Sequence, residues 1–296
     1  MKEHKTNRLR TAVRVCQAYS SKKNLYLVIC LLLCLQQYAF GQCRFNNQPF
    51  TDGEKVNYVL YFKWGILMPK AGQASIDFHK TNEDNKLGHS SRLLFRTTGM
   101  FESIYKMRDT LASFHDENMV LFRSGKHSNE GGYYSIDRIE FSYTDDHVSA
   151  HSLRYTPTRV RIDTVLTSEG CTFDMMSSLL YLRSLDYDKM QTGDRFSFKV
   201  MIGRDVVNVG FLYKGQAILE RDNAKFKTRH FSMDIFDEVF EQGESAAEIW
   251  IGDDENRIPV RLRAKLKLGA AEAYYTSSSG LKYPLNCRIE MPKGRR

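Results

Sequence analysis

Hydrophobic and polar residues alternate along most of the chain from residue 54 onward. In "EKVNYVLYFK" (54–63), Val56, Tyr58, Leu60 and Phe62 occupy every second position. Such alternation places one face of a strand in a core and the other in water. The pattern recurs at 71–80, 93–98, 110–114, 133–143, 148–154, 159–165, 196–202, 206–213, 226–235, 247–251 and 258–268. Clusters of Gly, Asn and Asp separate these segments, which predicts antiparallel hairpins and a mainly β protein. Residues 81–90 and 125–132 are interpreted as surface loops.

One segment in the middle of the chain has helical spacing instead. In "TFDMMSSLLYLRSLDYDKM" the apolar residues at that spacing are Phe173, Met176, Leu179, Leu180 and Leu182. We expect one helix over 173–185 with Thr172 as its N-cap. A sheet of so many strands must close on itself or be covered. The pattern therefore predicts a large, strongly curved antiparallel sheet, an open β-barrel, with one central α-helix.

The first 41 residues read as a signal peptide. Lys22 and Lys23 precede the apolar run Leu25–Leu35, and Ala39-Phe40-Gly41 fits the small-x-small cleavage pattern. As a helix this run spans roughly 16 Å, too short for a bilayer core of about 30 Å. The alternative is an uncleaved anchor. Residues 42–296 are then one mainly β domain, exported to the periplasm or associated with the outer membrane, with no transmembrane span in the mature form.

The net charge of +8 belongs mostly to this leader, whose first 41 residues hold seven Lys or Arg and one acid. Residues 42–296 are close to neutral, so the usual argument for nucleic-acid binding is absent. Three cysteines lie outside the leader: Cys43, Cys171 and Cys287. They allow one internal disulfide at most, and a Cys43–Cys287 bridge would join the two ends of the mature chain.

No sequence motif points to a cofactor or a metal. Nucleophile-elbow, phosphate-loop, dinucleotide and zinc-peptidase patterns are absent. His147 and His151 are spaced four apart, but in a strand pattern that separation is roughly 13 Å, too far for one metal. We expect both to face solvent. Asp109 lies in another strand pattern, and we expect it to form an ion pair there.

The connection "FKWGILMPKAG" is unusually apolar for a loop. Trp64 and Met68 in it are candidates for the lip of a hydrophobic pocket or for a loop that touches a membrane. The simpler interpretation, which we favour, folds this loop over the open end of the barrel and buries Trp64. A ligand at a concave face would also contact Tyr61, Tyr181 and Arg183.

A stripe of cations marks the last long strand pattern. Arg261, Arg263, Lys265 and Lys267 share one face of residues 258–268. They are candidates for binding an anionic glycan, lipid headgroup or other envelope component. A solvated outer face or a protected edge strand has the same pattern, and we favour that interpretation.

Three segments resemble the domain of unknown function 3108 family: "DGEKVNYVLYFKWGILMPKAGQASI", "FDMMSSLLYLRSLDYDKMQTGDRFSFKVMIGRDV" and "AEIWIGDDENRIPVRLRAKLKLGAAEA". The matching residues stand in the family's order: Gly53, Glu54, Tyr58, Ser178, Leu182, Arg183, Gly193, Asp194, Asp254, Arg257, Pro259, Val260 and Gly269. The resemblance implies an exported envelope protein of a Gram-negative bacterium with a barrel-like sheet. Its fold is similar to that of half-barrel lipoprotein carriers. No activity is established for the family.

The sequence leaves two functions open. The first is a non-catalytic binding or scaffold protein that holds a hydrophobic or glycan ligand in its curved sheet. The second is an envelope hydrolase or glycan-modifying enzyme that uses a carboxylate pair, drawn from Asp109, Asp253, Asp254 and Glu255. The run 253–255 falls between two strand patterns, so we expect a hairpin turn there. Its spacing of acids does not match a calcium loop.

Overall fold

The computed structural model describes residues 45, 47–144, 147–236, 243–266 and 268–290. The predicted signal peptide (1–41), Cys43 and Lys267 lie outside these residues. Strands dominate the described chain, and their bounds are β1 Glu54–Lys63, β2 Lys70–Glu83, β3 Lys86–Thr97, β4 Arg108–Asp116, β5 Leu121–Glu130, β6 Tyr133–Tyr143, β7 His147–Thr156, β8 Arg159–Glu169, β9 Thr172–Phe173, β10 Arg195–Ile202, β11 Asp205–Arg221, β12 Ala224–Phe236, β13 Gly243–Gly252, β14 Pro259–Lys265, β15 Ala270–Ser279 and β16 Arg288–Glu290. The helical elements are α2 Met100–Ile104, α3 Met175–Ser184 and the 3₁₀ turn η1 Tyr187–Lys189.

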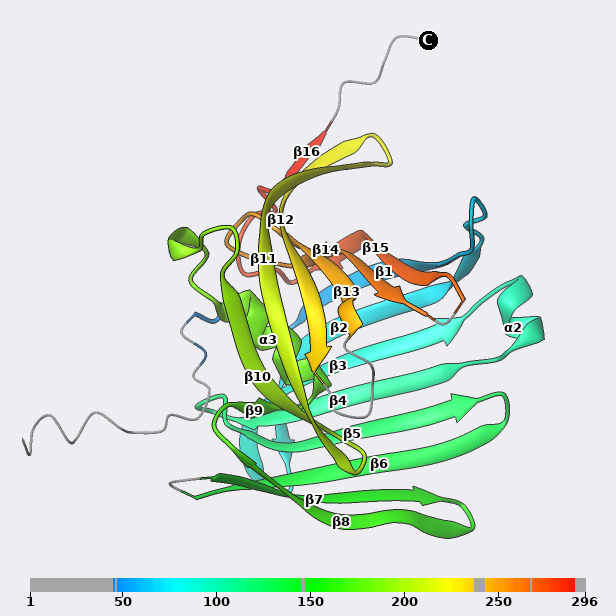
Figure 1. Cartoon of the computed structure of the whole chain (residues 1–296), viewed down its shortest axis with the longest axis vertical. Coiled ribbons are helices and arrows are strands. Elements are labelled where there is room, and N and C mark those ends of the chain that lie inside the picture. Colours follow the sequence, from blue (N-terminus) through cyan, green and yellow to red (C-terminus); the bar gives the residue numbers. More distant parts are fainter. Residues whose placement is uncertain (1–44, 46, 145–146, 237–242, 267, 291–296) are drawn as a thin grey trace, which may run out of the picture. The chain divides into compact units, whose positions relative to one another are not determined.

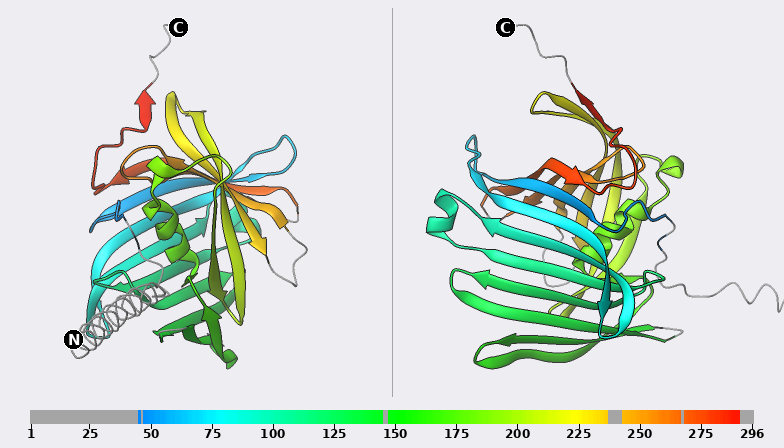
Figure 2. Two further views of the ribbon diagram at one scale, coloured as in Figure 1. Left: turned by 60° about the vertical axis from the view of Figure 1, so that its left-hand side comes forward. Right: turned by 180° about the vertical axis from the view of Figure 1, so that it is seen from behind.

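The strands form one continuous sheet in the order β8-β7-β6-β5-β4-β3-β2-β1-β15-β14-β13-β12-β11-β10-β9, and β16 pairs with β12. Neighbours are antiparallel, except that β9 runs parallel to β10. The sheet curls into an open barrel with α3 on its concave side (Figures 1 and 2). This confirms the predicted fold class.

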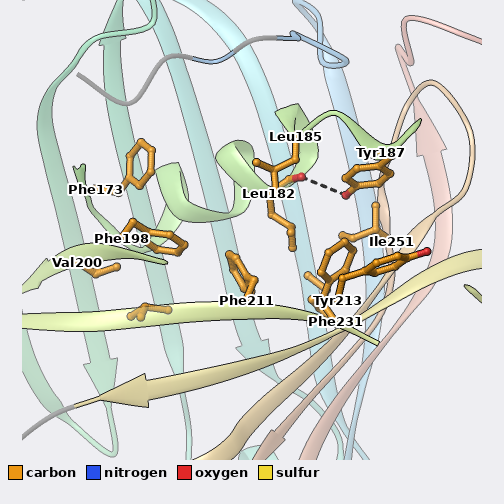
Figure 3. Close-up of a cluster of buried hydrophobic side chains, with 12 residues drawn as sticks. Phe173, Leu182, Leu185, Tyr187, Phe198, Val200, Phe211, Tyr213, Phe231 and Ile251 are labelled. Atoms are coloured by element: carbon orange, nitrogen blue, oxygen red, sulfur yellow. Dashed lines mark hydrogen bonds between the residues drawn. The ribbon is translucent and has the colours of Figure 1, made fainter. Parts of the chain in front are cut away.

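The core lies where α3 meets the sheet. Buried aromatic and aliphatic side chains from α3, η1 and strands β9 to β13 form its largest cluster (Figure 3). Leu182 of α3 is fully buried there, and its carbonyl accepts a 3.1 Å hydrogen bond from the hydroxyl of Tyr187. Helix α3 therefore occupies much of the concavity that an open sheet would otherwise expose to water.

The helix prediction was right in place but wrong in detail. Thr172 and Phe173 belong to β9, and the N-cap is Asp174, whose carboxylate accepts from the Ser177 amide at 2.8 Å. The structure also has the short helix α2, which the sequence pattern did not predict.

Both predicted surface loops were largely wrong. Strands β2 and β3 run through most of 81–90 and turn only at Asp84 and Asn85, which have φ of 50° and 62°. Strand β5 covers most of 125–132. Its inward positions are Ser124, Lys126 and Ser128, so this strand lacks the apolar alternation that was used to find the others.

The Cys43–Cys287 bridge that the sequence left open does not form, because Cys287 is a free, fully buried thiol. Cys171 is disulfide-bonded. Burial raises the pKa of the Cys287 thiol, and the nearby charge of Asp254 raises it further. Within the described residues, no helix is long and apolar enough to cross a membrane.

Candidate functional site

Exposed apolar side chains gather at one end of the barrel. Of the nineteen exposed large apolar side chains among the described residues, twelve come from the hairpin ends that meet there. We call them the apolar rim: Trp64, Ile66, Leu67, Met100, Ile104, Tyr105, Tyr133, Tyr134, Tyr155, Val160, Leu266 and Leu268. This end carries α2 on the right of Figure 1. A monomeric soluble protein rarely gathers apolar groups in this way unless the surface has a partner.

The turn between β1 and β2 is the most exposed part of the rim. Trp64 and Leu67 exchange two backbone hydrogen bonds of 2.9 and 3.0 Å, which leaves Gly65 and Ile66 at the tip. Gly65 has φ of 57°, a conformation that glycine adopts without strain. Ile66 is 100% exposed and Trp64 is 62% exposed. The prediction that this loop folds back and buries Trp64 is therefore wrong.

The rim hairpins are fastened to one another. Phe62 lies 6.0 Å from Phe101 of α2, ring centroid to ring centroid. The amide of Gly131, in the turn between β5 and β6, donates to the carbonyl of Lys106 at 2.8 Å. Gly269, in the turn between β14 and β15, packs against the carbonyl of Lys63 so closely that a Cβ would lie 2.1 Å from it. The rim is thus a set of mutually supported turns.

Cations accompany the rim. Lys70, Lys106 and Arg159 are exposed beside the apolar turns, and none of them has a carboxylate partner among the described residues. Two described acids at this end are paired, Glu102 with Arg108 and Glu130 with Lys126. Exposed cations beside apolar side chains favour an anionic surface as partner.

The five predicted ligand residues do not form one site. Trp64 and the half-buried Met68 lie in the rim turn. Tyr61 lies on the outer face, where its ring is 5.9 Å from that of Tyr274. Tyr181 packs inside the core, with its ring 4.9 Å from that of Phe173. Arg183 is buried elsewhere on α3, so the structure separates these residues into four places.

Arg183 instead joins three signature segments into one junction. Its guanidinium is 2% exposed and contacts the two carboxylate oxygens of Glu54 at 2.6 and 3.1 Å. It also donates to the carbonyl of Asn256 at 2.8 Å. The Arg257 guanidinium in turn donates a 3.2 Å hydrogen bond to the backbone carbonyl of Arg183.

The remaining signature residues support this junction and a second turn. Tyr58 donates its hydroxyl to the carbonyl of Pro259 at 3.0 Å. Asp254 accepts from the amides of Asn256 at 3.0 Å and of Cys287 at 3.0 Å. Further along the chain, Gly193 has φ of 103°, and the carboxylate of Asp194 accepts from the Gln191 amide at 2.7 Å. Gly53, with φ of 83°, sets the turn before Glu54.

A family model described as a protein of unknown function, DUF3108, matches residues 57–276. The chain belongs to the DUF3108 family. A search of curated proteins finds no match. Among solved structures, a β-barrel-like protein of the DUF1849 family from Brucella abortus is similar, with a TM-score of 0.57 and 13% identity over 76% of this chain and 96% of that one. A protein of Bacteroides fragilis described as exported, with a YmcC-like fold, matches with a TM-score of 0.30 and 11% identity over 78% of this chain and 97% of that one.

In this DUF3108 protein these signature residues make contacts within the fold. They tie β1, α3 and the turn between β13 and β14 together through groups that are far apart in sequence. The likeness to the DUF1849 protein shows the fold alone. Neither the family nor its structural neighbours indicate a reaction or a ligand.

The predicted cationic stripe has partners inside the molecule. Arg261 contacts the buried Glu272 at 2.8 Å and lies 4.4 Å from the centre of the Trp250 ring. Arg263 contacts Glu248 at 3.3 Å and Glu272 at 3.7 Å. Burial raises the pKa of Glu272, but the Tyr274 hydroxyl and the Arg261 charge outweigh it and hold this pKa below its usual value. Binding of an anionic partner along this stripe stays a prediction.

The candidate catalytic carboxylates are engaged in local contacts. Asp109 is buried on β4 and accepts from the Asn129 amide at 3.2 Å, with Lys126 at 3.4 Å. Asp253 pairs with Arg229 at 2.7 Å, Asp254 supports its own turn, and Glu255 is exposed. The expected hairpin turn at 253–255 is confirmed.

No group of three or more His, Cys, Asp or Glu that could hold a metal occurs in the described ranges. His147 and His151 lie on the outward side of β7, and His151 pairs with Asp163 at 2.7 Å.

A buried polar cluster lies beneath the start of α3. His115 Nε2 is 2.9 Å from the Ser177 hydroxyl, and the Ser113 hydroxyl donates to Asp174. These are the residue types of a hydrolytic triad, but Asp174 is bonded to the serines rather than to the His115 ring, whose Nδ1 has no hydrogen-bond partner. All four side chains are buried. Burial lowers the pKa of His115 to about 3 and raises that of Asp174. The arrangement caps the helix and has no access for a substrate.

Most of the rim was not predicted from the sequence. Its members outside the Trp64 turn come from α2, from the turns that contain Gly99, Gly131 and Gly269, and from the turn between β7 and β8. A usable signal was available, because each of these glycines lies within a few residues of large apolar side chains. Turn residues are usually polar, so apolar residues at several turns mark a contact surface.

Proposed function

We propose that this protein is an exported cell-envelope protein, without a catalytic role, whose apolar rim docks on an anionic lipid surface. The observation that carries the proposal is the gathering of twelve exposed apolar side chains at one end of the barrel, with exposed lysines and an arginine beside them. Trp and Tyr at such a surface favour the interface between headgroups and acyl chains. Lys and Arg favour anionic headgroups.

The size of the rim is adequate for reversible binding. Burying one Ile or Leu side chain from water contributes about 1.5–3 kcal/mol, and each cation near an anionic surface adds about 1 kcal/mol. Insertion of Ile66, Leu67 and Trp64 alone would give a measurable affinity for vesicles. The rim positions the barrel on a membrane and does not span it.

The test is flotation of residues 42–296 on vesicles of phosphatidylglycerol and phosphatidylethanolamine. Ile66→Ser combined with Ile104→Ser should lower the partition coefficient at least tenfold, since each lost side chain is worth more than the 1.4 kcal/mol that a factor of ten requires. The matched control is Leu94→Ser combined with Val165→Ser. Both residues are exposed, at 41% and 62%, but lie on the outer face of the sheet away from the rim.

Trp64 provides a second readout. The chain has two tryptophans, and Trp250 is 7% exposed. In a Trp250→Phe background, the emission of Trp64 should shift to the blue when phosphatidylglycerol vesicles are added. Vesicle binding that is equal in wild type and rim variant, or no binding at low salt, would disprove the proposal.

A further inference from the structure

A pocket of about 660 Å³ lies at the seam of the open barrel, between strands β6, β7 and β8 and the turn that joins β10 to β11. Its volume falls in the range of small-molecule sites, about 300–1,000 Å³. Three arginines line it, Arg154, Arg161 and Arg204, together with the single acid Asp205. No sequence motif pointed to this place. Tyr133 of the apolar rim also lines the pocket, so the two surfaces adjoin, but this inference does not rest on the lipid-docking proposal above.

Arg154 is held in position by an acid outside the pocket lining. Its Nε and Nη2 each contact a different carboxylate oxygen of Asp137 at 2.6 Å. The Asp137 side chain is 14% exposed. This two-point contact fixes the plane of the guanidinium and leaves Nη1 for a further acceptor. The hydrogen bond to Asp137 raises the pKa of Arg154 although burial acts in the opposite direction, so the guanidinium stays charged.

A β-bulge places Arg161 beside it. The pairing of β7 with β8 passes from Arg154↔Ile162 to Tyr155↔Val160, so Arg161 is the extra residue and has no partner opposite. Bulges re-aim a side chain, and they are found next to binding sites. Here the bulge brings Arg161 into the same pocket lining as Ile162 rather than leaving it on the outer face.

The turn between β10 and β11 supplies the third guanidinium. Gly203 has φ of 60°, and Ile202 pairs with Asp205 across the turn. The Ser152 hydroxyl of β7 donates to the Gly203 carbonyl, and Arg204 Nη2 donates to the carbonyl of Arg161 at 3.4 Å. The turn is thus fastened to β7 and β8, and Arg204 is anchored beside Arg161.

We propose that this pocket binds an anion that carries phosphate or carboxylate groups, such as a phosphorylated sugar or a lipid headgroup. Arginine suits both groups because its planar donors match two oxygens at once. Arg161 and Arg204 have no carboxylate partner among the described residues. Ile162 and Ile202 give the pocket an apolar wall for the uncharged part of the ligand.

The experiment is isothermal titration of residues 42–296 at low ionic strength with two probes: glucose 1-phosphate, and dihexanoyl phosphatidic acid below its micelle concentration. Saturable binding of either probe is expected, weakened at least tenfold in Arg161→Gln combined with Arg204→Gln. The control is Arg96→Gln, an exposed arginine on β3 that donates only to Gln73. It should bind as wild type does.

The two probes distinguish the source of the anion. Binding of phosphatidic acid alone assigns the pocket to a headgroup, and binding of glucose 1-phosphate assigns it to soluble phosphorylated sugars. No saturable binding of either probe at millimolar concentration overturns the proposal. So does equal weakening in Arg96→Gln, which would indicate general charge attraction. The pocket variant keeps every apolar side chain of the rim, so absence of probe binding in the pocket leaves rim docking standing.

Discussion

The buried pair of Glu54 and Arg183 should dominate the stability of this fold. Both side chains are 2% exposed, and 129 residues separate them in sequence. Arg183→Met removes the guanidinium and leaves the Glu54 carboxylate buried without its partner. Removal of one member of a buried pair costs about 3–5 kcal/mol.

The structure allows this figure to be refined. Arg183 also donates to the Asn256 carbonyl at 2.8 Å, and loss of that bond adds about 1 kcal/mol. The single variant should therefore lose about 4–6 kcal/mol, a large share of the 5–15 kcal/mol typical of a domain. Glu54→Leu combined with Arg183→Met removes both charges together. It should lie within about 2 kcal/mol of wild type, because apolar replacement of a buried pair is often neutral.

Urea denaturation followed by both circular dichroism and fluorescence gives the free energies, provided that the two transitions coincide. Arg138→Met is the matched control, since Arg138 pairs with Glu140 at the surface with both side chains more than 40% exposed. It should change the free energy of unfolding by less than about 1 kcal/mol. The reasoning fails if Arg183→Met costs no more than this control, or if the double variant loses the sum of the two single losses.

Three further predictions concern single residues. His115 has a pKa of about 3 in the folded protein, against about 6.5 in the unfolded chain. Between these two values only the unfolded chain binds the extra proton, so the free energy of unfolding falls as the pH drops from about 6.5 toward 3. The free energy of unfolding of wild type relative to His115→Gln should change by about 1.4 kcal/mol per pH unit between pH 6 and 4; a flat difference would contradict the burial argument. Gly269→Ala should lower the melting temperature by several degrees, because Gly269 has φ of 81° and its Cβ would lie 2.1 Å from the Lys63 carbonyl; Gly125→Ala, whose nearest contact is 3.5 Å, is the control. Cys287 should resist a thiol reagent in the native protein and react fully in urea without reductant, since it is free, buried and of raised pKa; rapid labelling of the native protein would refute this.

Alternation of hydrophobic and polar residues predicted the strands correctly wherever the barrel interior is apolar. Residues 54–63 and 133–143 were predicted with the bounds that β1 and β6 have. Alternation failed for β5, because the alternate positions Ser124, Lys126 and Ser128 on its inward side are polar. A pattern that identifies strands by hydrophobic contrast cannot detect a strand whose two faces are both polar.

Long-range contacts explain what else the sequence could not show. The role of Arg183 depends on Glu54, which lies on a strand that reaches it only after the sheet has curled. Arg183 could be identified as a signature residue from its resemblance but not as half of a buried ion pair. Similarly, Trp64 was expected to be buried under a loop folded over the open end of the barrel. The two hydrogen bonds to Leu67 form a tight turn instead, and Trp64 is 62% exposed.

The pairing of β1 with β15 has a consequence for how the chain acquires its shape. The Asn57 side chain donates to Ser277, 220 residues away. One edge of β1 therefore stays unpaired until β15 has been synthesised. An unpaired strand edge is a template for association with other chains, and such distant closure slows folding. The newly made chain therefore passes through a long interval in which its first strand is vulnerable to aggregation, and a chaperone that shields this edge would raise the yield of native protein.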